Sequence, residues 1–415
     1  MSEHRGMQFF GVPASIFFVM FVPGHLFSWA VEWLWLGIQV LTAIVLMFVV
    51  RQTVCSTAGI KPQVWTGFFL LVTVCGAASA LHAAVVLNIK TSTNDIPDLL
   101  RFLIFIPLAL FIGATSTSSF AAQLERVLKL VIVFNLITAA LLLLNVPGFA
   151  SLLMVIYGEA KIQFDFGHIR IGIPFTNPNF AALVFVLALG YFSFFRKSLV
   201  FATLTLVSLF LTGSRSGLLA ATPILMAVYL LYVVRAMRKP RLLILLLVLH
   251  AMAIVWVAQA LEAMGGFGRI VELIEAVQAG NLAQVDTASI RFDLIKAALG
   301  FIERSPLLGI GPGRSYGLDV TDSQLIAWPV MYGIPLALLI GGFFLWIFTN
   351  SLRLASSGEL VLGILATAAS FFLMLSTGDF MKNYRLFYIS VLIAHGIYLV
   401  VAARQKEHVT AVCAN

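Results

Sequence analysis

The sequence predicts an all-α protein that crosses a membrane many times. Of its 415 residues, 61% are apolar and only 11% are charged, whereas a soluble domain is typically about 45–50% apolar and about 25% charged. The apolar residues also gather into runs that reach the length of about 20 residues needed to span a bilayer. These two observations exclude an ordinary water-soluble globule, and we expect residues 1–415 to form a single integral membrane domain.

We expect about twelve transmembrane helices in this polytopic chain, because the apolar runs are separated by short polar connections. Proline occurs inside several runs, and neighbouring helices of a bundle can satisfy the backbone groups that it frees. The expected spans are 8–27, 30–50, 63–87, 99–115, 127–146, 178–195, 198–212, 217–235, 241–261, 325–349, 358–376 and 385–403.

The basic residues predict the orientation of the spans. With a cytoplasmic N-terminus, 14 of the 26 Lys and Arg residues fall in the inner connections and 12 on the outer side. Five of those 12 lie in the long segment 262–324, and long loops do not count in the positive-inside rule. The bias of 14 to 7 predicts that both termini are cytoplasmic. We therefore interpret the net charge of +8 mainly as a topology signal in a lipid-embedded protein, and expect no nucleic-acid partner.

Two outer segments are long enough to contain more than a turn. They are the loops 147–177 and 262–324, and in the second of them 269–279 and 288–304 are expected to be helical.

The first candidate site is at 212–217, Thr-Gly-Ser-Arg-Ser-Gly, which joins two apolar runs with almost no loop. Ser214 or Ser216 can cap the helix that follows. The free N–H groups at the start of that helix, together with Arg215, would suit a phosphate group. A tight turn from which Arg215 reaches lipid headgroups is the alternative.

The second candidate site is at 170–179, Arg-Ile-Gly-Ile-Pro-Phe-Thr-Asn-Pro-Asn, which leads directly into the span 178–195. This segment places Arg170 at the outer membrane edge beside the amides of Asn177 and Asn179, where they can bind a substrate. Alternatively, Asn177 or Asn179 only caps the helix.

The third candidate is Arg291. On a helical wheel of 288–304, Arg291 falls among Leu294, Ala298 and Ile302, in the middle of the apolar arc. A charge on a buried face needs an anionic partner, either a ligand phosphate or a protein carboxylate. The opposite, charged face carries Asp293, Lys296, Glu303 and Arg304.

The fourth candidate is the end of the second loop, where a glycine-rich stretch runs from 305 to Arg314. Its glycines permit positive φ and a close backbone approach, although no Gly-Lys-Ser/Thr follows, so it is not a Walker loop. The loop re-enters the membrane at Asp322-Ser323, where Asp322 can cap a helix or act as a general base.

No set of His, Cys and carboxylate residues has the spacing of metal ligands, so we expect no metal. No motif for a cofactor is present either. His25, His82, His250 and His395 are scattered singly and are interpreted as structural.

Taken together, these motifs resemble the O-antigen ligase and polymerase superfamily of bacterial inner-membrane glycan enzymes. The resemblance covers about residues 165–345, and the first half of the chain matches only in hydropathy. It runs in order through 170–179, 212–217, Arg291, 306–313 (Pro-Leu-Leu-Gly-Ile-Gly-Pro-Gly), Asp322-Ser323 and 333–335 (Gly-Ile-Pro).

The resemblance implies a GT-C-like membrane glycosyltransferase architecture, with a large periplasmic loop that contains short helices. It also implies an undecaprenyl-pyrophosphate-linked glycan donor, a lipid-linked glycan or lipid A–core acceptor, and an active site at the periplasmic face of the inner membrane. The resemblance further implies transfer without metal or nucleotide. If the acceptor hydroxyl displaces the leaving group directly, we expect the anomeric carbon to be inverted. A chain-length regulator is a further candidate partner.

The position of Asp322 favours one branch of the superfamily. Ligases typically have His there, followed by Asn, Ser or Gln and, after nine more residues, by Gly; here Asp322-Ser323 precede Gly333 with that spacing. An Asp-Ser pair looks more like polymerases of O-antigen or exopolysaccharide repeats. We therefore favour a polymerase, with an O-antigen ligase as the first alternative and other superfamily members, such as protein O-oligosaccharyltransferases, after it.

A transporter or flippase of lipid-linked glycans is the alternative from another class. Transporter sites usually lie near the membrane midplane, whereas the candidate charges of this chain gather at the outer face. We expect Arg170, Arg215 and Arg291 to bind pyrophosphate, Asn177, Asn179, Ser214, Ser216 and Arg314 to contact substrate, and Asp322 to act as the base.

Overall fold

The computed structural model describes residues 62–89, 117–157, 162–165, 168–173, 175, 177–236, 286–311, 323–377 and 384–414. The expected spans 8–27, 30–50, 99–115 and 241–261 lie outside these residues. The helices are α3 (Pro62–Val85), α6 (Thr117–Leu143), α7 (Phe149–Tyr157), α8 (Pro178–Gly190), the π-helix η5 (Tyr191–Phe195), α9 (Leu199–Leu211), α10 (Arg215–Ala236), α13 (Asp286–Arg304), α14 (Gln324–Leu354), α15 (Gly358–Thr377) and α16 (Tyr384–Ala414).

The expectation of a helical membrane protein is confirmed over the described residues. Six helices there are long and apolar enough to cross a membrane, and each coincides with an expected span. The six windows are Thr66–Val85, Phe120–Leu143, Pro178–Phe195, Ser216–Val234, Leu325–Leu354 and Gly358–Ser376. The shorter α9 matches the expected segment 198–212, and α16 contains the expected segment 385–403. The total of twelve spans stays a prediction.

The structure adds a small antiparallel sheet to the helices. Strands β1 (Ile162–Asp165) and β2 (His168–Ile171) form a hairpin within the first outer loop. Apolar and polar residues alternate along β2, the pattern of a half-buried strand, and two residues connect the strands. The register pairs Ile162 with Ile171 and Gln163 with Arg170.

Helix α6 begins at Thr117, ten residues before the expected start of its span at 127. The sequence places Glu125 and Lys129 near that start, and charged residues usually mark the end of a span. In the structure the charge on Glu125 is paired: its carboxylate lies 2.6 Å from Lys129 Nζ and 2.8 Å from Arg196 Nε. The helix can therefore continue past both charges.

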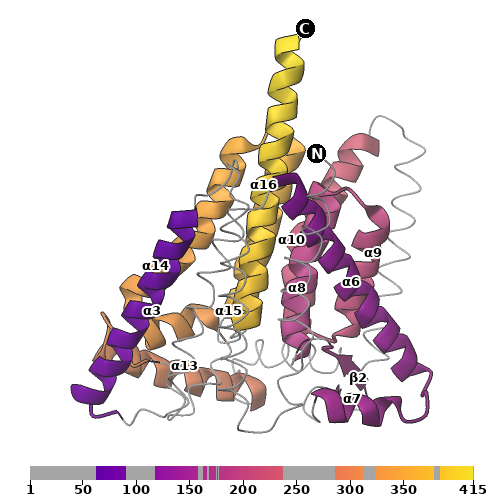
Figure 1. Ribbon diagram of the computed structural model, residues 1–415. Coiled ribbons are helices and arrows are strands. Elements are labelled where there is room, and N and C mark those ends of the chain that lie inside the picture. The colour runs from indigo at the N-terminus through magenta and orange to yellow at the C-terminus, as the bar shows by residue number, and fades with distance from the viewer. Residues whose placement is uncertain are drawn as a thin grey trace, which may run out of the picture.

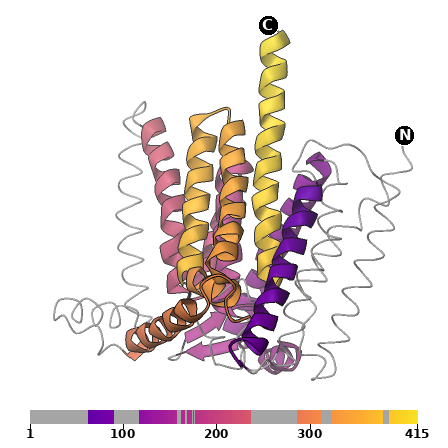
Figure 2. The same ribbon diagram turned by 90° about the vertical axis from the view of Figure 1, so that its left-hand side faces the viewer.

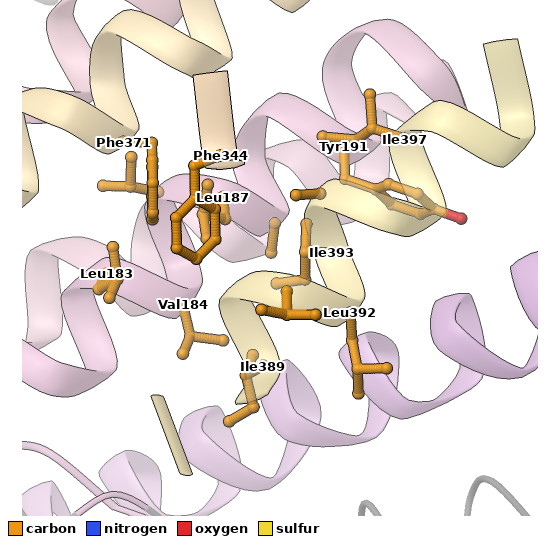
Figure 3. Close-up of a cluster of buried hydrophobic side chains, with 14 of the residues drawn as sticks. Leu183, Val184, Leu187, Tyr191, Phe344, Phe371, Ile389, Leu392, Ile393 and Ile397 are labelled. Carbon is orange, nitrogen blue, oxygen red and sulfur yellow. The ribbon is translucent and has the colours of Figure 1, made fainter. Parts of the chain in front are cut away.

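Helix α8 is the centre of the bundle. Eleven of its residues are buried, and it packs against α9, α10, α15 and α16. Figure 3 shows the side chains of α8 facing those of its neighbours in one apolar cluster. The labelled members are Leu183, Val184, Leu187, Tyr191, Phe344, Phe371, Ile389, Leu392, Ile393 and Ile397. Because lipid tails are as apolar as these side chains, close van der Waals packing rather than escape from water holds such helices together.

The two ends of the bundle carry different structure. We call the end that holds α7, β1, β2 and α13 the loop end, and both views place these elements together there (Figures 1 and 2). At the opposite end the last turns of α16 project beyond the other helices. We call this the basic end, because it holds Lys129, Arg196, Lys197, Arg353 and Arg404.

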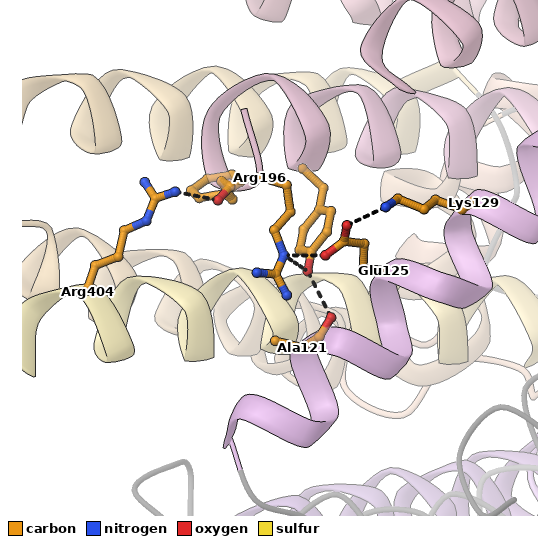
Figure 4. A network of polar contacts seen from close by, with 7 residues as sticks. Ala121, Glu125, Lys129, Arg196 and Arg404 are labelled. Carbon is orange, nitrogen blue, oxygen red and sulfur yellow. Dashed lines mark hydrogen bonds and ion pairs between the residues drawn. The ribbon is translucent and has the colours of Figure 1, made fainter. Parts of the chain in front are cut away.

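Most of these basic residues are tied to the bundle by polar contacts (Figure 4). Arg196 Nε also donates to the hydroxyl of Tyr191, at 3.2 Å. Arg404 Nη2 donates to the carbonyl oxygen of Phe195, at 2.6 Å. Phe195 ends the π-helix, where the wider turn changes the backbone hydrogen-bonding pattern. Lys197 Nζ reaches the carboxylate of Glu359 at the start of α15, at 3.0 Å.

Candidate active site

The start of α10 is built by a serine cap. Ser214 is fully buried, and its Oγ accepts a hydrogen bond from the backbone N–H of Gly217, at 3.1 Å. The same Oγ lies 3.1 Å from the hydroxyl of Ser216. Thr212 Oγ1 accepts from the N–H of Ser214, at 3.2 Å. The described contacts of Ser214 are thus those of a helix cap. The features of this turn that suit an anion are therefore Arg215 and the free backbone N–H groups at the start of α10.

The start of α8 is capped in a similar way by Asn177. Its Oδ1 accepts from the N–H of Asn179, at 2.8 Å, and Pro178 follows as the first helical residue. Proline is favoured there because its missing N–H would have no partner in the helix anyway. The described contact of Asn177 is therefore that of a helix cap. Asn179 is half-buried in the first turn of α8.

Helices α8 and α10 pack closely near their starts, where Gly217, the third residue of α10, lies against Ala182, the fifth residue of α8. A Cβ added to Gly217 would lie 2.6 Å from Cβ of Ala182, so only glycine permits this approach. Because each helix start carries a partial positive charge and free N–H donors, two adjacent starts form a favourable place for an anion. Arg215 is the first residue of α10 and therefore belongs to this place.

The strand that carries Arg170 lies beside the same region. Ile171 and Ile173 are buried in a cluster with residues of α6, and Leu211 packs against this cluster. Leu211 ends α9, immediately before the turn that leads to Arg215, and α9 contacts β2. The structure thus brings the chain at Arg170 close to the turn before Arg215. The side chains of both arginines lie outside the described residues.

A buried asparagine of α6 holds the connection between β2 and α8. Asn135 is fully buried, and its Nδ2 donates to the carbonyl oxygen of Ile173, at 2.7 Å. Asn135 was not among the candidate residues predicted from the sequence. A lone amide within an otherwise apolar span was the available signal, since polar groups inside a membrane need partners.

The amphipathic pattern predicted for α13 is confirmed where side chains are described. Ala298 is fully buried and clusters with Ala83 of α3, Ile310 and Val330 of α14. The four residues predicted on the charged face are exposed: Asp293, Lys296, Glu303 and Arg304. Arg291 lies in α13 seven residues before Ala298 and so shares its side of the helix, although its side chain lies outside the described residues.

The glycine-rich stretch after α13 packs on a break in α14. Gly333 has φ of 78° and interrupts the helical backbone, and Pro335 has no N–H to offer the carbonyl of Met331. Instead, the carbonyl of Met331 accepts from the N–H of Gly311, at 3.0 Å. In the same way, the N–H of Ile310 donates to the carbonyl oxygen of Val330, at 2.8 Å. The two glycine motifs, 306–313 and 333–335, are thus brought together.

The expected site residues therefore fall into three groups. Asn177, Asn179, Ser214 and Ser216 are described, at the starts of α8 and α10. The backbone of Arg170, Arg215 and Arg291 is described, and all three lie on loop-end elements. Arg314 and Asp322 lie outside the described residues, so their roles stay predictions.

A family model described as O-antigen ligase matches residues 199–330. The match runs from α9 through α10 and α13 into α14, and it includes Arg215, Arg291 and Asp322. No curated protein matches the chain. The chain is therefore similar to the O-antigen ligase family over residues 199–330, and its resemblance to the O-antigen ligase and polymerase superfamily is confirmed.

Proposed function

We propose that this protein is a glycosyltransferase that polymerises lipid-linked repeat units at the periplasmic face of the bacterial inner membrane. It would transfer an undecaprenyl-pyrophosphate-linked glycan to the hydroxyl of an acceptor sugar. One observation carries the proposal: α8 and α10 pack closely near their starts at the loop end, and α10 begins with Arg215 within the matched segment.

The orientation proposed for the chain puts this site at the periplasmic face. Lys129, Arg196, Lys197, Arg353 and Arg404 lie at the opposite end of the bundle, and all of them count among the inner residues of the positive-inside bias. Because cytoplasmic connections carry the excess of Lys and Arg, the basic end is cytoplasmic in this proposal. The loop end is then periplasmic.

In the proposed reaction Arg170, Arg215 and Arg291 bind the donor pyrophosphate. Arginine suits this role because it stays charged and binds phosphate oxygens with two parallel hydrogen bonds. The acceptor oxygen attacks the anomeric carbon, and the bond from that carbon to the phosphate oxygen breaks. Asp322 takes the hydroxyl proton, and undecaprenyl pyrophosphate leaves with the bonding electrons. Direct displacement inverts the anomeric carbon, and the arginines stabilise the charge that develops on the leaving group.

An O-antigen ligase is the second candidate, and the description of the matching family favours it. A ligase would use the same donor and the same pyrophosphate site, but it would transfer the glycan to lipid A–core. The Asp322-Ser323 pair, in a position where ligases typically have His, supports the polymerase instead.

The test is turnover of a defined undecaprenyl-pyrophosphate-linked repeat by the purified protein, with and without lipid A–core. Longer lipid-linked chains would support the polymerase, and glycan on the core would support the ligase. Arg215→Ala should lower the rate by about 10²–10³-fold, as expected for the loss of one preorganised donor. Asp322→Asn should lower kcat more than it weakens donor binding.

Arg304→Ala is the matched control, because Arg304 is exposed on the far face of α13. It should leave turnover within about twofold of the unaltered protein. If Arg215→Ala and Asp322→Asn also retain near-normal turnover, the assigned roles are wrong. If the folded protein forms neither product, the proposed function is wrong.

A further inference from the structure

Helix α3 lies outside the matched segment 199–330, yet one of its side chains joins Gly311 of that segment to Met331, the residue directly after it. Ser79 is fully buried. Its Oγ donates to the carbonyl oxygen of Met331, at 2.6 Å, and accepts from the N–H of Gly311, at 2.8 Å. One hydroxyl thus bonds both the broken helix α14 and the end of the glycine-rich stretch.

This hydroxyl repairs part of the break in α14. In an uninterrupted helix the carbonyl of Met331 would accept the N–H of the residue four positions on, which here is Pro335. A carbonyl left without a donor inside a membrane is costly. Ser79 and Gly311 together supply the donors that the proline cannot give.

The contact between α3 and the loop extends beyond one side chain. A Cβ added to Gly311 would lie 3.1 Å from Cα of Ala80, so the two backbones nearly touch. Closer to the end of α3, His82 Nδ1 lies 3.4 Å from the hydroxyl of Ser305, which is buried. Helix α3 therefore contacts both ends of the stretch 305–311.

The position of this contact links α3 to the proposed chemistry. The stretch 305–311 is followed in sequence by Arg314 and Asp322, and α14 begins at Gln324. Ser323 is held at the start of α14 by the N–H of Ala327, at 2.9 Å. The chain is thus fixed on α14 at Gly311, eleven residues before the proposed base, and again at Ser323, the residue after it.

We propose that Ser79 is a positioning residue for the transfer reaction, acting through Gly311 and Met331 to fix the outer loop on α14. This inference rests on the proposed function above. It assigns a role to a part of the chain that resembles the superfamily only in hydropathy.

The test compares Ser79→Ala with Thr73→Val in the full-length protein. Thr73 is the matched control, because it is a buried hydroxyl of α3 whose bond among the described residues stays within its own helix, to Phe69, at 2.9 Å. Ser79→Ala leaves the bond from Gly311 to Met331 in place, so the variant should fold. Hydrogen exchange at 305–311 should rise in Ser79→Ala and stay unchanged in Thr73→Val.

The expected effects of Ser79→Ala on kcat and KM follow from the roles assigned to Ser79, the arginines and Asp322. Ser79→Ala should lower kcat about tenfold, because a small displacement of catalytic groups is costly. The KM for the lipid-linked donor should change by less than about twofold, since the arginines that bind pyrophosphate lie on other elements. In an Asp322→Asn background, Ser79→Ala should cause no further loss, because it acts through the segment that carries Asp322.

Three results would overturn the inference. They are a Ser79→Ala variant with the kcat and hydrogen exchange of the Thr73→Val control, a full additional loss in the Asp322→Asn background, and a lower rate explained entirely by less folded protein. A failure of the proposed function looks different, because the unaltered protein would then form no transfer product.

Discussion

The two ends of the bundle use their polar groups in different ways. Among the described residues, the ion pairs lie at the basic end and join Glu125 to Lys129 and Arg196, and Lys197 to Glu359. At the loop end the described side-chain contacts are mostly between uncharged groups and the backbone. These groups are Ser79, Asn135, Asn177 and Ser214.

This difference separates two kinds of basic residue. Lys129 and Arg196 share one carboxylate, and Lys129 also lies over the ring of Phe201, with Nζ 4.7 Å from the ring centroid. Their charges hold helices together. At the loop end the described side-chain contacts that hold the backbone come mostly from uncharged groups. Charge alone therefore does not identify a site; the surroundings of the charge do.

The largest effect should come from replacing the glycine at the break in α14. In Gly333→Ala a Cβ would overlap the carbonyl of Leu307, at a φ of 78° that L-residues rarely adopt. We expect a loss of more than about 2 kcal/mol in the free energy of unfolding, or failure to fold. Thermal unfolding in detergent, together with the yield of monodisperse protein, would measure it.

Gly342→Ala in the same helix is the control, because a Cβ there meets no atom within 4 Å. It should be neutral or stabilise the helix by up to about 1 kcal/mol. Equal effects of the two substitutions would show that the contact with the loop does not stabilise the loop end.

The break at Gly333 also shows what the sequence could predict. The spans of α3, α8, α10, α14 and α15 were predictable from hydropathy, because each is a long apolar run. The pairing of the two glycine motifs was not predictable, since it joins segments about 20 residues apart through backbone atoms that have no sequence signal. The roles of Ser79 and Asn135 were hidden for a related reason: a single hydroxyl or amide in an apolar run does not reveal its partner.

At the candidate site, the residue types alone did not decide the roles of the side chains. Asn177 and Ser214 are residue types that serve equally well as helix caps and as substrate ligands, and only the geometry identifies the capping contacts. Arg291 was placed by periodicity, and the burial of Ala298 supports that placement. Glu125 was not singled out from the sequence, whereas in the structure it is an ion-pair partner of Arg196.

The second-largest effect on stability should come from a substitution at the basic end. Glu125→Gln removes the carboxylate shared by Lys129 and Arg196, whose side chains are 35% and 30% exposed. We expect a loss of about 1–2 kcal/mol in the free energy of unfolding, between the values for exposed and buried pairs. Turnover per folded molecule should not change, because the pair holds helices together far from the proposed site. Denaturation in detergent and the transfer assay would test the two parts.

Lys197→Ala is the milder comparison at the same end. Its side chain is 49% exposed, and among the described residues its ion-pair partner is Glu359, so the loss should be below about 1 kcal/mol and should shrink further in high salt. If Lys197→Ala destabilises the protein more than Glu125→Gln, the carboxylate of Glu125 does not make the most stabilising ion pairs at the basic end.

The last substitution, Asn135→Leu, should affect activity more than stability. The substitution removes the hydrogen bond to Ile173, and such bonds between membrane helices contribute about 1 kcal/mol. Because Ile173 connects the strand of Arg170 to α8, turnover should fall by about tenfold. Thr349→Val removes a hydroxyl that bonds within its own helix, to Leu345, at 2.8 Å, and should change neither quantity. A variant Asn135→Leu with unchanged turnover would contradict the idea that uncharged groups at the loop end position the site, because Asn135 would then stabilise the fold in the same way as Glu125.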